Sequence, residues 1–215
     1  MTEREGSTYS LEAERRHYRH APPQVARDYR WLRAYLDCLP DLRPLLAGRE
    51  VLDIGAGECL YSALIAERYA ARVVALELIP ERMQPAARTF RLANLWFVAG
   101  DCHRLPFPDA CFDAVFGDLV LHHFPALEPI VAEIRRVLRP GGAYVGIEPN
   151  FSNPAVRLHF RFVAKSHNEC AHSPARLRRL FETAGFQVEQ HFFWGRFPRL
   201  RQRFLTTSVG IVARS

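Results

Sequence analysis

Two glycines and two carboxylates lie close together in the segment VLDIGAGECL, residues 51–60. Gly55 and Gly57 have no Cβ atom, so the chain can turn sharply there and its backbone can pack directly against a ligand. A dinucleotide site needs a third glycine three residues after the second, and Leu60 occupies that position. Glu58 follows the turn, where a carboxylate at a helix start competes with a bound phosphate. The segment therefore predicts a ligand other than a pyrophosphate.

Acidic residues end the apolar runs that follow along the chain. Glu77 closes VVALE, where a carboxylate can accept hydrogen bonds from both hydroxyls of a ribose. Asp101 closes FVAGD, where it can accept a hydrogen bond from an adenine amino group. Asp53 and the peptide carbonyls around Gly55 and Asp118 would face an ammonium group. S-adenosylmethionine carries all of these groups, so these residues predict it as the cofactor.

A regular alternation of short apolar runs and helical stretches must position these residues. The runs predicted as strands are 51–54, 73–76, 95–98, 113–116 and 143–147, and the helices expected between them are 61–70, 81–93 and 127–138. Such an alternation predicts parallel strands that are joined by right-handed crossovers and buried on both faces. The fold class is therefore α/β with a doubly wound sheet, in which ligands bind at the carboxyl ends of the strands.

The C-terminal part of the chain predicts one helix and two further strands. The helix spans 173–185, with Ser173 as its N-cap and Gly185 after its end. Two strand patterns follow, at 186–194 and 204–213. The Arg- and Pro-rich connector between them is too short for a crossover helix, so the last strand should be antiparallel.

Three parts of the chain differ in pattern. Residues 1–47 predict an N-terminal helical cap, and 48–215 form the main domain. Within that domain we expect an irregular, lid-like insertion at about 149–172. Its mixture of phenylalanine and histidine suits an aromatic or amphipathic molecule.

The bulk composition limits the class of protein. A hydrophobic content of 48% with 24% charged residues is typical of a globular domain, and no apolar run approaches the roughly 20 residues of a membrane span. The charged first twenty residues lack the apolar stretch of a signal peptide. Five scattered cysteines suggest neither a disulfide framework nor a zinc knuckle, so we expect a cytoplasmic protein. The sequence gives no signal for an oligomeric state.

Four sequence blocks resemble the class I S-adenosylmethionine-dependent methyltransferase superfamily, in particular the small-molecule group that includes the ubiquinone and menaquinone biosynthesis methyltransferases. The blocks occur in the family's order over about residues 48–150, and they read VLDIGAGEC, VVALELIPERM, GDCHRLPFPDACFDAVFGDLVLHHF and RVLRPGGAYVGIEP. The resemblance implies a Rossmann-like, seven-stranded, mostly parallel sheet. One departure is Cys59, because the family usually has a third glycine there, and another is Glu58, which is usually a small or polar residue.

The resemblance also implies the cofactor contacts. The implied contacts are Asp53, Gly55 and Gly57 at the methionine end, Glu77 with the adjacent Leu78 at the ribose, Asp101 and Cys102 at the adenine, and Asp118 near the amino-acid moiety.

Methylation of a hydroxyl or ammonium requires removal of a proton, and histidine is the natural base near neutral pH. His122 and His123 follow the fourth predicted strand, beside the expected methyl group, and are the candidate catalytic residues. Glu148 and Asn150 leave the fifth strand toward the same crevice, and His167 lies in the lid-like insertion, so these three are candidate substrate contacts. No pair of ligands has the spacing of a zinc motif, and no metal is predicted.

The sequence thus predicts an enzyme that transfers a methyl group to oxygen, nitrogen or carbon of a small-molecule metabolite by in-line displacement. The DLVL segment after the fourth strand, residues 118–121, argues against methylation of nucleic-acid bases at nitrogen, which usually goes with an Asn/Asp-Pro-Pro-aromatic block. Two alternatives stay open. One is an RNA methyltransferase, which the net charge of +6 and the basic ends would suit. The other is a non-catalytic S-adenosylmethionine-binding protein, in which Glu58 and Cys59 would mark a degraded site.

Overall fold

The structure of the protein, a computed structural model, describes residues 39, 42–69, 72–163, 170–193 and 205–215. The expected N-terminal cap lies outside these residues except for Leu39 and 42–47, and so do the connector 194–204 and the candidate substrate contact His167.

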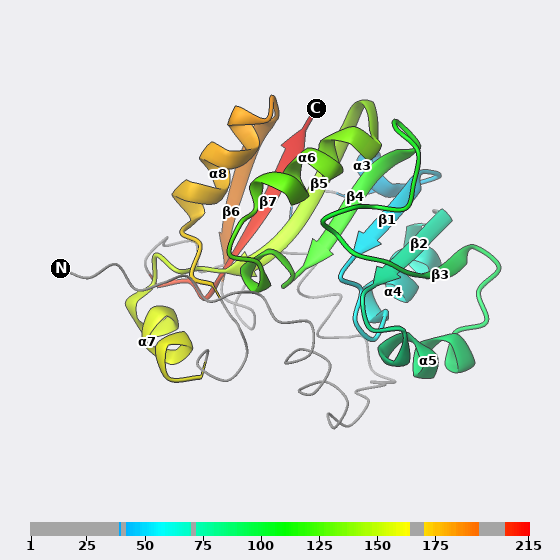
Figure 1. Cartoon of the computed structure of the whole chain (residues 1–215), viewed down its shortest axis with the longest axis horizontal. Helices are drawn as coiled ribbons and strands as arrows, with labels where there is room; N and C mark the ends of the chain where they lie inside the picture. The colour runs from blue at the N-terminus through cyan, green and yellow to red at the C-terminus, as the bar shows by residue number, and fades with distance from the viewer. Residues whose placement is uncertain (1–38, 40–41, 70–71, 164–169, 194–204) are drawn as a thin grey trace.

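One mixed sheet organises the described residues (Figure 1). Its seven strands are β1 (Glu50–Ile54), β2 (Arg72–Glu77), β3 (Leu95–Ala99), β4 (Phe112–Asp118), β5 (Leu138–Pro149), β6 (Gln187–Phe193) and β7 (Ser208–Arg214). Their order is β3-β2-β1-β4-β5-β7-β6, and only β7 is antiparallel to its neighbours. The predicted Rossmann-like doubly wound sheet with an antiparallel last strand is therefore confirmed.

Helices cover both faces of the sheet. The described helices are α3 (Arg43–Leu46), α4 (Leu60–Tyr69), α5 (Pro80–Thr89), the 3-10 helix η1 (Leu121–His123), α6 (Glu128–Val137), α7 (Pro154–Val163) and α8 (Pro174–Thr183). As predicted, the Ser173 side chain caps α8 by accepting a hydrogen bond from the Arg176 amide. None of the helices in the described part of the chain has the length and apolar composition needed to cross a lipid bilayer.

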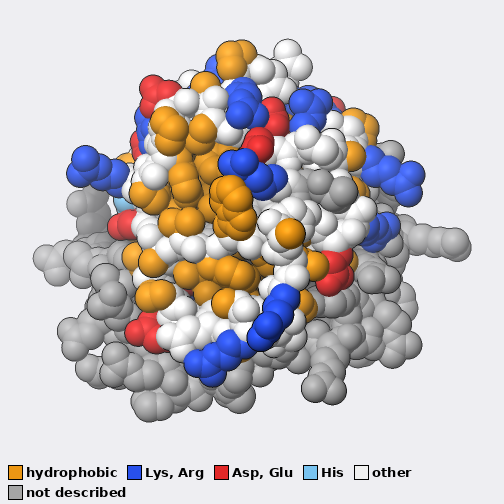
Figure 2. All heavy atoms as spheres, turned by 90° about the vertical axis from the view of Figure 1, so that its right-hand side faces the viewer, with side chains coloured by type: hydrophobic (Ala, Val, Ile, Leu, Met, Phe, Trp, Pro, Cys, Tyr) orange, Lys and Arg blue, Asp and Glu red, His pale blue; other side chains and the backbone are white. Residues whose placement is uncertain are grey.

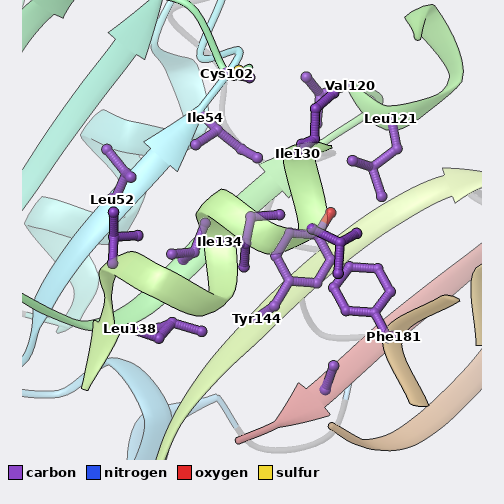
Figure 3. Close-up of a cluster of buried hydrophobic side chains, with 14 of the residues drawn as sticks. Leu52, Ile54, Cys102, Val120, Leu121, Ile130, Ile134, Leu138, Tyr144 and Phe181 are labelled. Atoms are coloured by element: carbon purple, nitrogen blue, oxygen red, sulfur yellow. The ribbon is translucent and has the colours of Figure 1, made fainter. Parts of the chain in front are cut away.

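Alternate residues of the central strands enter two separate cores. Val51 and Phe116 pack with apolar residues of α3, α4 and α5 on one face. Leu52 and Ile54 pack with residues of α6 and α8 on the other face, where Tyr144 stacks on Phe181 with ring centroids 4.8 Å apart (Figure 3). Because both faces are buried, the strands read in the sequence as continuous apolar runs.

The edge strand β3 carries exposed apolar surface. Figure 2 views the side of the molecule on which β3 lies, and apolar side chains gather there among charged ones. Trp96 of β3 is 48% exposed. The guanidinium of Arg72 lies 4.4 Å from its ring centroid, a cation–π contact that covers part of the indole.

Two segments differ from their predictions. The insertion 149–172 is not irregular throughout, because α7 occupies ten of its residues. Strand β5 begins at Leu138 rather than at residue 143, and it includes the segment RPGG. Its pairing with β4 is interrupted there by a register shift, and Gly141 adopts a φ of +76°.

The order of the strands reverses between β1 and β4. In an open α/β sheet, the crevice at such a switch point is where ligands bind. The glycine turn that follows β1 and the residues that follow β4 therefore lie together at the carboxyl edge of the sheet.

Candidate functional site

The turn between β1 and α4 has an unusual backbone. Gly55, Gly57 and Cys59 all have left-handed φ angles, of +61°, +54° and +57°. A Cβ atom on Gly55 would lie 2.3 Å from Cγ2 of Val120, so only glycine fits there. Cys59 takes the same conformation at the cost that any residue with a Cβ atom incurs, which explains why glycine is usual at this position.

Glu77 ties this turn to the end of β2. Its side chain is buried, and its Oε2 accepts a hydrogen bond of 2.8 Å from the Gly57 amide. Its Oε1 accepts a bond of 3.0 Å from the Ile79 amide. Arg82, which the sequence analysis missed, lies 3.6 Å from Oε2. A carboxylate has about four acceptor sites, so Glu77 keeps acceptor capacity for a ligand.

Asp53 lies beside the turn on the side of α4. It is 2% exposed, and the Ser62 hydroxyl donates to its Oδ2 at 2.5 Å. Burial raises the pKa of Asp53 to about 7; the Ser62 hydrogen bond opposes this rise and the charge of Glu77 adds to it. The carboxyl group is therefore poised to gain or lose a proton near neutral pH.

Asp118 ends β4 on the other side of the switch point. Its Oδ1 is buried and accepts no hydrogen bond from any residue that the structure describes. Burial, and then the charges of Glu148 and Asp53, raise the pKa of Asp118 well above that of an ordinary carboxyl group. A buried acceptor without a partner is costly, so this oxygen fits a cationic or hydrogen-bond-donating ligand.

Asp101 and Cys102 follow β3 at the same edge. The Asp101 Oδ1 accepts a hydrogen bond of 2.8 Å from the His103 amide and lies 2.8 Å from Nδ1 of that residue. Its side chain is half exposed, whereas Cys102 is buried. Leu78, directly after Glu77, is half-buried. These three residues thus lie at the ends of neighbouring strands β2 and β3.

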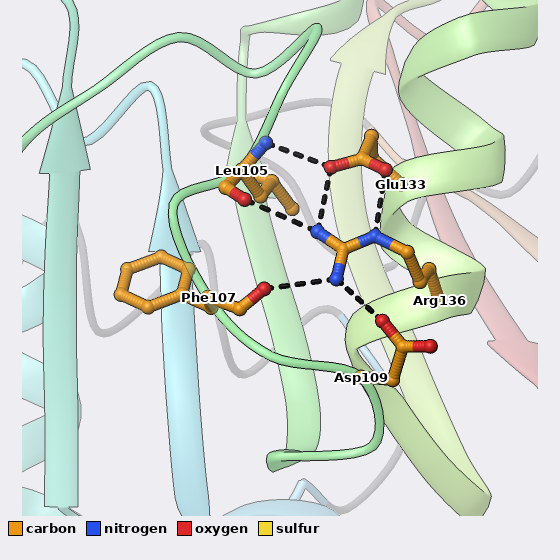
Figure 4. A network of polar contacts seen from close by, with 5 residues as sticks. All are labelled: Leu105, Phe107, Asp109, Glu133 and Arg136. Atoms are coloured by element: carbon orange, nitrogen blue, oxygen red, sulfur yellow. Dashed lines mark hydrogen bonds and ion pairs between the residues drawn. The ribbon is translucent and has the colours of Figure 1, made fainter.

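The loop that continues from Asp101 is fixed to α6 by Arg136 (Figure 4). Its guanidinium forms two hydrogen bonds with Glu133, of 2.7 and 2.8 Å, and a third of 2.8 Å with Asp109. It also donates to the carbonyl oxygens of Leu105 and Phe107, at 3.1 and 2.8 Å. One side chain therefore holds both arms of the loop that borders the predicted adenine position.

Replacing Arg136 by lysine should lower the free energy of unfolding by roughly 1 to 3 kcal/mol, because an ammonium cannot reproduce the planar fork of donors. Urea denaturation followed by circular dichroism would measure this loss. The matched control is Arg88→Lys on the exposed surface of α5, which should stay within about 0.5 kcal/mol of the parent. Equal losses in the two variants would contradict the prediction.

His122 and Glu148 form a buried pair. Nδ1 of His122 lies 2.8 Å from Oε2 of Glu148. The other oxygen of Glu148 accepts hydrogen bonds from the amides of Val120 and Leu121, at 3.1 and 2.8 Å. Because an ionised carboxylate only accepts, the proton of a neutral His122 belongs on Nδ1. Nε2 is then the basic atom, and it has no hydrogen bond to a described residue.

His123 lies beside His122, whereas Asn150 is engaged by hydrogen bonds within the protein. The His123 ring lies 4.3 Å from the His122 ring, centroid to centroid. Asn150 is fully buried; its amide donates to the carbonyl and hydroxyl oxygens of Thr206, both at 3.0 Å, and its Oδ1 accepts from the Ser152 amide. Asn150 thus ties its segment to Thr206, and Glu148 is a hydrogen-bond partner of His122. Their role as substrate contacts stays a prediction.

Four carboxylates thus gather at the carboxyl ends of neighbouring strands, and they are Asp53, Glu77, Asp118 and Glu148. Arg82 is the one arginine within ion-pair distance of them in the described part of the chain. Like charges in a buried site destabilise one another, and a ligand cation relieves that repulsion. The donor set and the glycine turn therefore fit S-adenosylmethionine, whose sulfonium and ammonium groups are both positive.

Comparisons with known proteins agree with this geometry. A family profile described as "Methyltransferase domain" matches residues 52–146. A relative from Mycolicibacterium smegmatis, named "Probable S-adenosylmethionine-dependent methyltransferase", is 33% identical over 78% of this chain and 63% of its own length. A demethylmenaquinone methyltransferase from Tropheryma whipplei is 34% identical over 63% of this chain and 56% of its own length.

A solved structure shows the same fold. The S-adenosylmethionine-dependent methyltransferase from Mesorhizobium loti superposes with a TM-score of 0.70 at 18% identity, over 85% of this chain and 96% of that one. The chain spans less than two thirds of the two curated relatives. The profile match over residues 52–146, these relatives and this fold confirm the predicted resemblance to the class I S-adenosylmethionine-dependent methyltransferase superfamily.

Proposed function

We propose that the protein transfers the methyl group of S-adenosylmethionine to a small-molecule acceptor. The observation that carries this proposal is the gathering of the buried carboxylates Asp53 and Glu77 with Asp118, whose buried Oδ1 accepts no hydrogen bond from a described residue. When bound, the cofactor supplies a methyl group on a positively charged sulfur.

The chain's own residues would divide the work of binding. Glu77 would accept from the ribose hydroxyls with the acceptor sites that the Gly57 and Ile79 amides leave free. Asp53 and Asp118 would face the ammonium group. Arg82 packs over the position of a Gly57 Cβ atom, at 2.9 Å, so its flexible side chain must move if the ribose lies there.

His122 would take the acceptor's proton on Nε2. Glu148 would hold the ring in the tautomer with the proton on Nδ1 and would stabilise the imidazolium that forms. Because the two backbone amides fix Glu148, the base keeps one orientation at the carboxyl end of β4. Such a base contributes roughly 10² to 10⁴ in rate, in addition to the effect of alignment.

A metabolite is the acceptor that the sequence and the relatives favour. The relative from Tropheryma whipplei is named for demethylmenaquinone, a small molecule. The segment DLVL, residues 118–121, lacks the block that accompanies methylation of nucleic-acid bases at nitrogen. We infer a cytoplasmic location as part of the same proposal, since Cys59, Cys102 and Cys111 are thiols rather than members of a disulfide.

Isothermal titration calorimetry with S-adenosylmethionine and S-adenosylhomocysteine tests the proposal. We expect binding of both, and its absence up to roughly 1 mM, a free energy of about −4 kcal/mol, would contradict a cofactor site. Methyl transfer from labelled cofactor to a panel of quinols, phenols, amines and carboxylic acids tests turnover. Binding without transfer to any member would identify a non-catalytic protein instead.

Cofactor affinity should fall about tenfold between pH 8 and pH 6. The pKa of Asp53 is raised to about 7 in the free protein, so this carboxyl group is mostly protonated at pH 6 and ionised at pH 8. A bound cation favours the charged form, and binding at pH 6 must therefore expel a proton. Calorimetry at both pH values measures the ratio.

The matched control for this pH dependence is Asp53→Asn, which keeps the shape of the side chain and removes the titration. Its affinity should change less between the two pH values than that of the parent protein. The raised pKa of Asp53 also makes the free energy of unfolding depend on pH. Without ligand, the folded state binds more protons than the unfolded state between about pH 4 and 7, so the free energy of unfolding falls as pH rises through that range. If cofactor affinity depended on pH in Asp53→Asn as it does in the parent protein, Asp53 would not be the group that titrates.

A further inference from the structure

A groove of about 470 Å³ lies between α7 and the segment 205–208. Its apolar walls include Leu119, Val156, Phe160 and Leu205. The volume falls within the range of pockets that bind small organic molecules. The groove is outside the set of cofactor residues described above.

The described polar residues in the walls are Asn153, His159, Thr207 and Ser208, and the protein itself engages the Asn153 side chain and the Thr207 carbonyl oxygen. Asn153 donates to the carbonyl oxygen of Thr206 at 3.1 Å and accepts from the Ala155 amide at 2.9 Å. The carbonyl oxygen of Thr207 accepts a hydrogen bond of 2.9 Å from the backbone N–H of Asn150. Among the described residues that line the groove there is no Asp, Glu, Lys or Arg, so this part of its surface favours an apolar occupant.

The groove reaches the candidate catalytic histidine through one side chain. The Phe160 ring lines the groove and packs edge-on against the His122 ring, with centroids 5.9 Å apart and planes at 89°. On the other side, Leu119 directly follows Asp118, is 42% exposed, and holds a left-handed φ of +51°. Strained backbone conformations cluster at ligand and active sites, and an exposed leucine in such a conformation is consistent with a ligand site.

We propose that this groove binds an alkyl or isoprenoid chain carried by the methyl acceptor, so that the acceptor is an amphiphile with its polar head at His122. The proposal rests on the proposed methyl transfer for the role of the head group. The apolar chain itself requires only the groove.

A chain-length series tests the groove without any cofactor. Octanol, decanol and dodecanol serve as uncharged probes, with binding measured by displacement of 1-anilinonaphthalene-8-sulfonate and by calorimetry. Burial of each CH₂ contributes about 0.8 kcal/mol, so affinity should rise about fourfold per methylene and about fifteenfold per probe step until the groove is full. An affinity that does not depend on chain length would overturn the proposal.

Two variants and one control locate the binding. Ala155→Trp should fill the groove, and Leu205→Asp should place a charge in its wall; each should weaken dodecanol at least about tenfold. Phe162→Asp changes a side chain of the same helix that is 74% exposed and does not line the groove, and it should bind dodecanol like the parent. Equal loss in the control, or no loss in the two groove variants, would overturn the proposal.

The failure of this inference is distinguishable from failure of the proposed function. Thermal melts establish that each variant is folded, and S-adenosylhomocysteine should bind all three variants as it binds the parent. If that ligand binds but the probes show no chain-length dependence, the groove proposal alone is wrong. If the probes bind as expected and the ligand does not bind, the groove stands and the methyltransferase proposal is wrong.

Discussion

Replacing Glu148 by glutamine should lower kcat by roughly 10²- to 10⁴-fold while cofactor affinity changes little. The Val120 and Leu121 amides both donate to Oε1, so the amide oxygen of the variant is expected to stay there. Its NH₂ group then faces Nδ1 of His122, which must become an acceptor. The ring proton moves to Nε2, and the base can no longer take a proton from the acceptor.

Two measurements separate this effect from a general loss of structure. Nitrogen-15 chemical shifts of the imidazole should report the proton on Nδ1 in the parent and on Nε2 in Glu148→Gln. The matched control is Asp113→Asn, at the opposite end of β4, where the carboxylate accepts from the Glu50 amide and pairs with Arg139. That variant should lose stability and keep kcat, and a comparable fall in kcat would count against the role of Glu148.

Gly55→Ala should lower the free energy of unfolding by roughly 2 to 5 kcal/mol, the largest stability effect that we expect. Two costs add at this position. A left-handed φ of +61° is unfavourable for alanine by about 1 to 2 kcal/mol. Overlap of the new Cβ with the Val120 side chain, at 2.3 Å, costs about 1 to 3 kcal/mol more.

Gly48→Ala isolates the first of these costs. Gly48 has a φ of +65°, and no atom lies within 4 Å of the Cβ position. Chemical denaturation should therefore give a loss of only about 1 to 2 kcal/mol for this variant. Cofactor affinity should fall in Gly55→Ala and stay unchanged in Gly48→Ala, since only the former alters the turn that follows β1. Equal stability losses would show that the contact with Val120 relaxes freely.

The strands of the central sheet could be predicted because burial on both faces leaves a local trace. Val51–Ile54 and Val73–Leu76 read as apolar runs, and the structure extends each by only one or two residues. Helix α7 could not be predicted in this way. Its large apolar residues Val156, Leu158, Phe160 and Phe162 alternate with other residues, which is the period of a strand rather than a helix.

The site residues that follow the ends of strands could be predicted from the sequence. The contacts between side chains of different elements could not. Gly55 and Glu77 can be identified in the sequence by their residue type and by their position at the end of an apolar run. The partnership of Glu148 with His122 joins residues 26 positions apart on β5 and η1. No local pattern records such a contact, because the register between β4 and β5 decides which side chains meet.

The position of β7 has a consequence for how the chain is made. β6 pairs only with β7, and β7 lies between β5 and β6, yet its residues leave the ribosome last among the described strands. Until then, the edge of β5 stays unpaired, including the apolar Val145 and Ile147. Nascent chains stalled before residue 208 would thus present an unpaired, aggregation-prone strand edge, the form of polypeptide on which holding chaperones act.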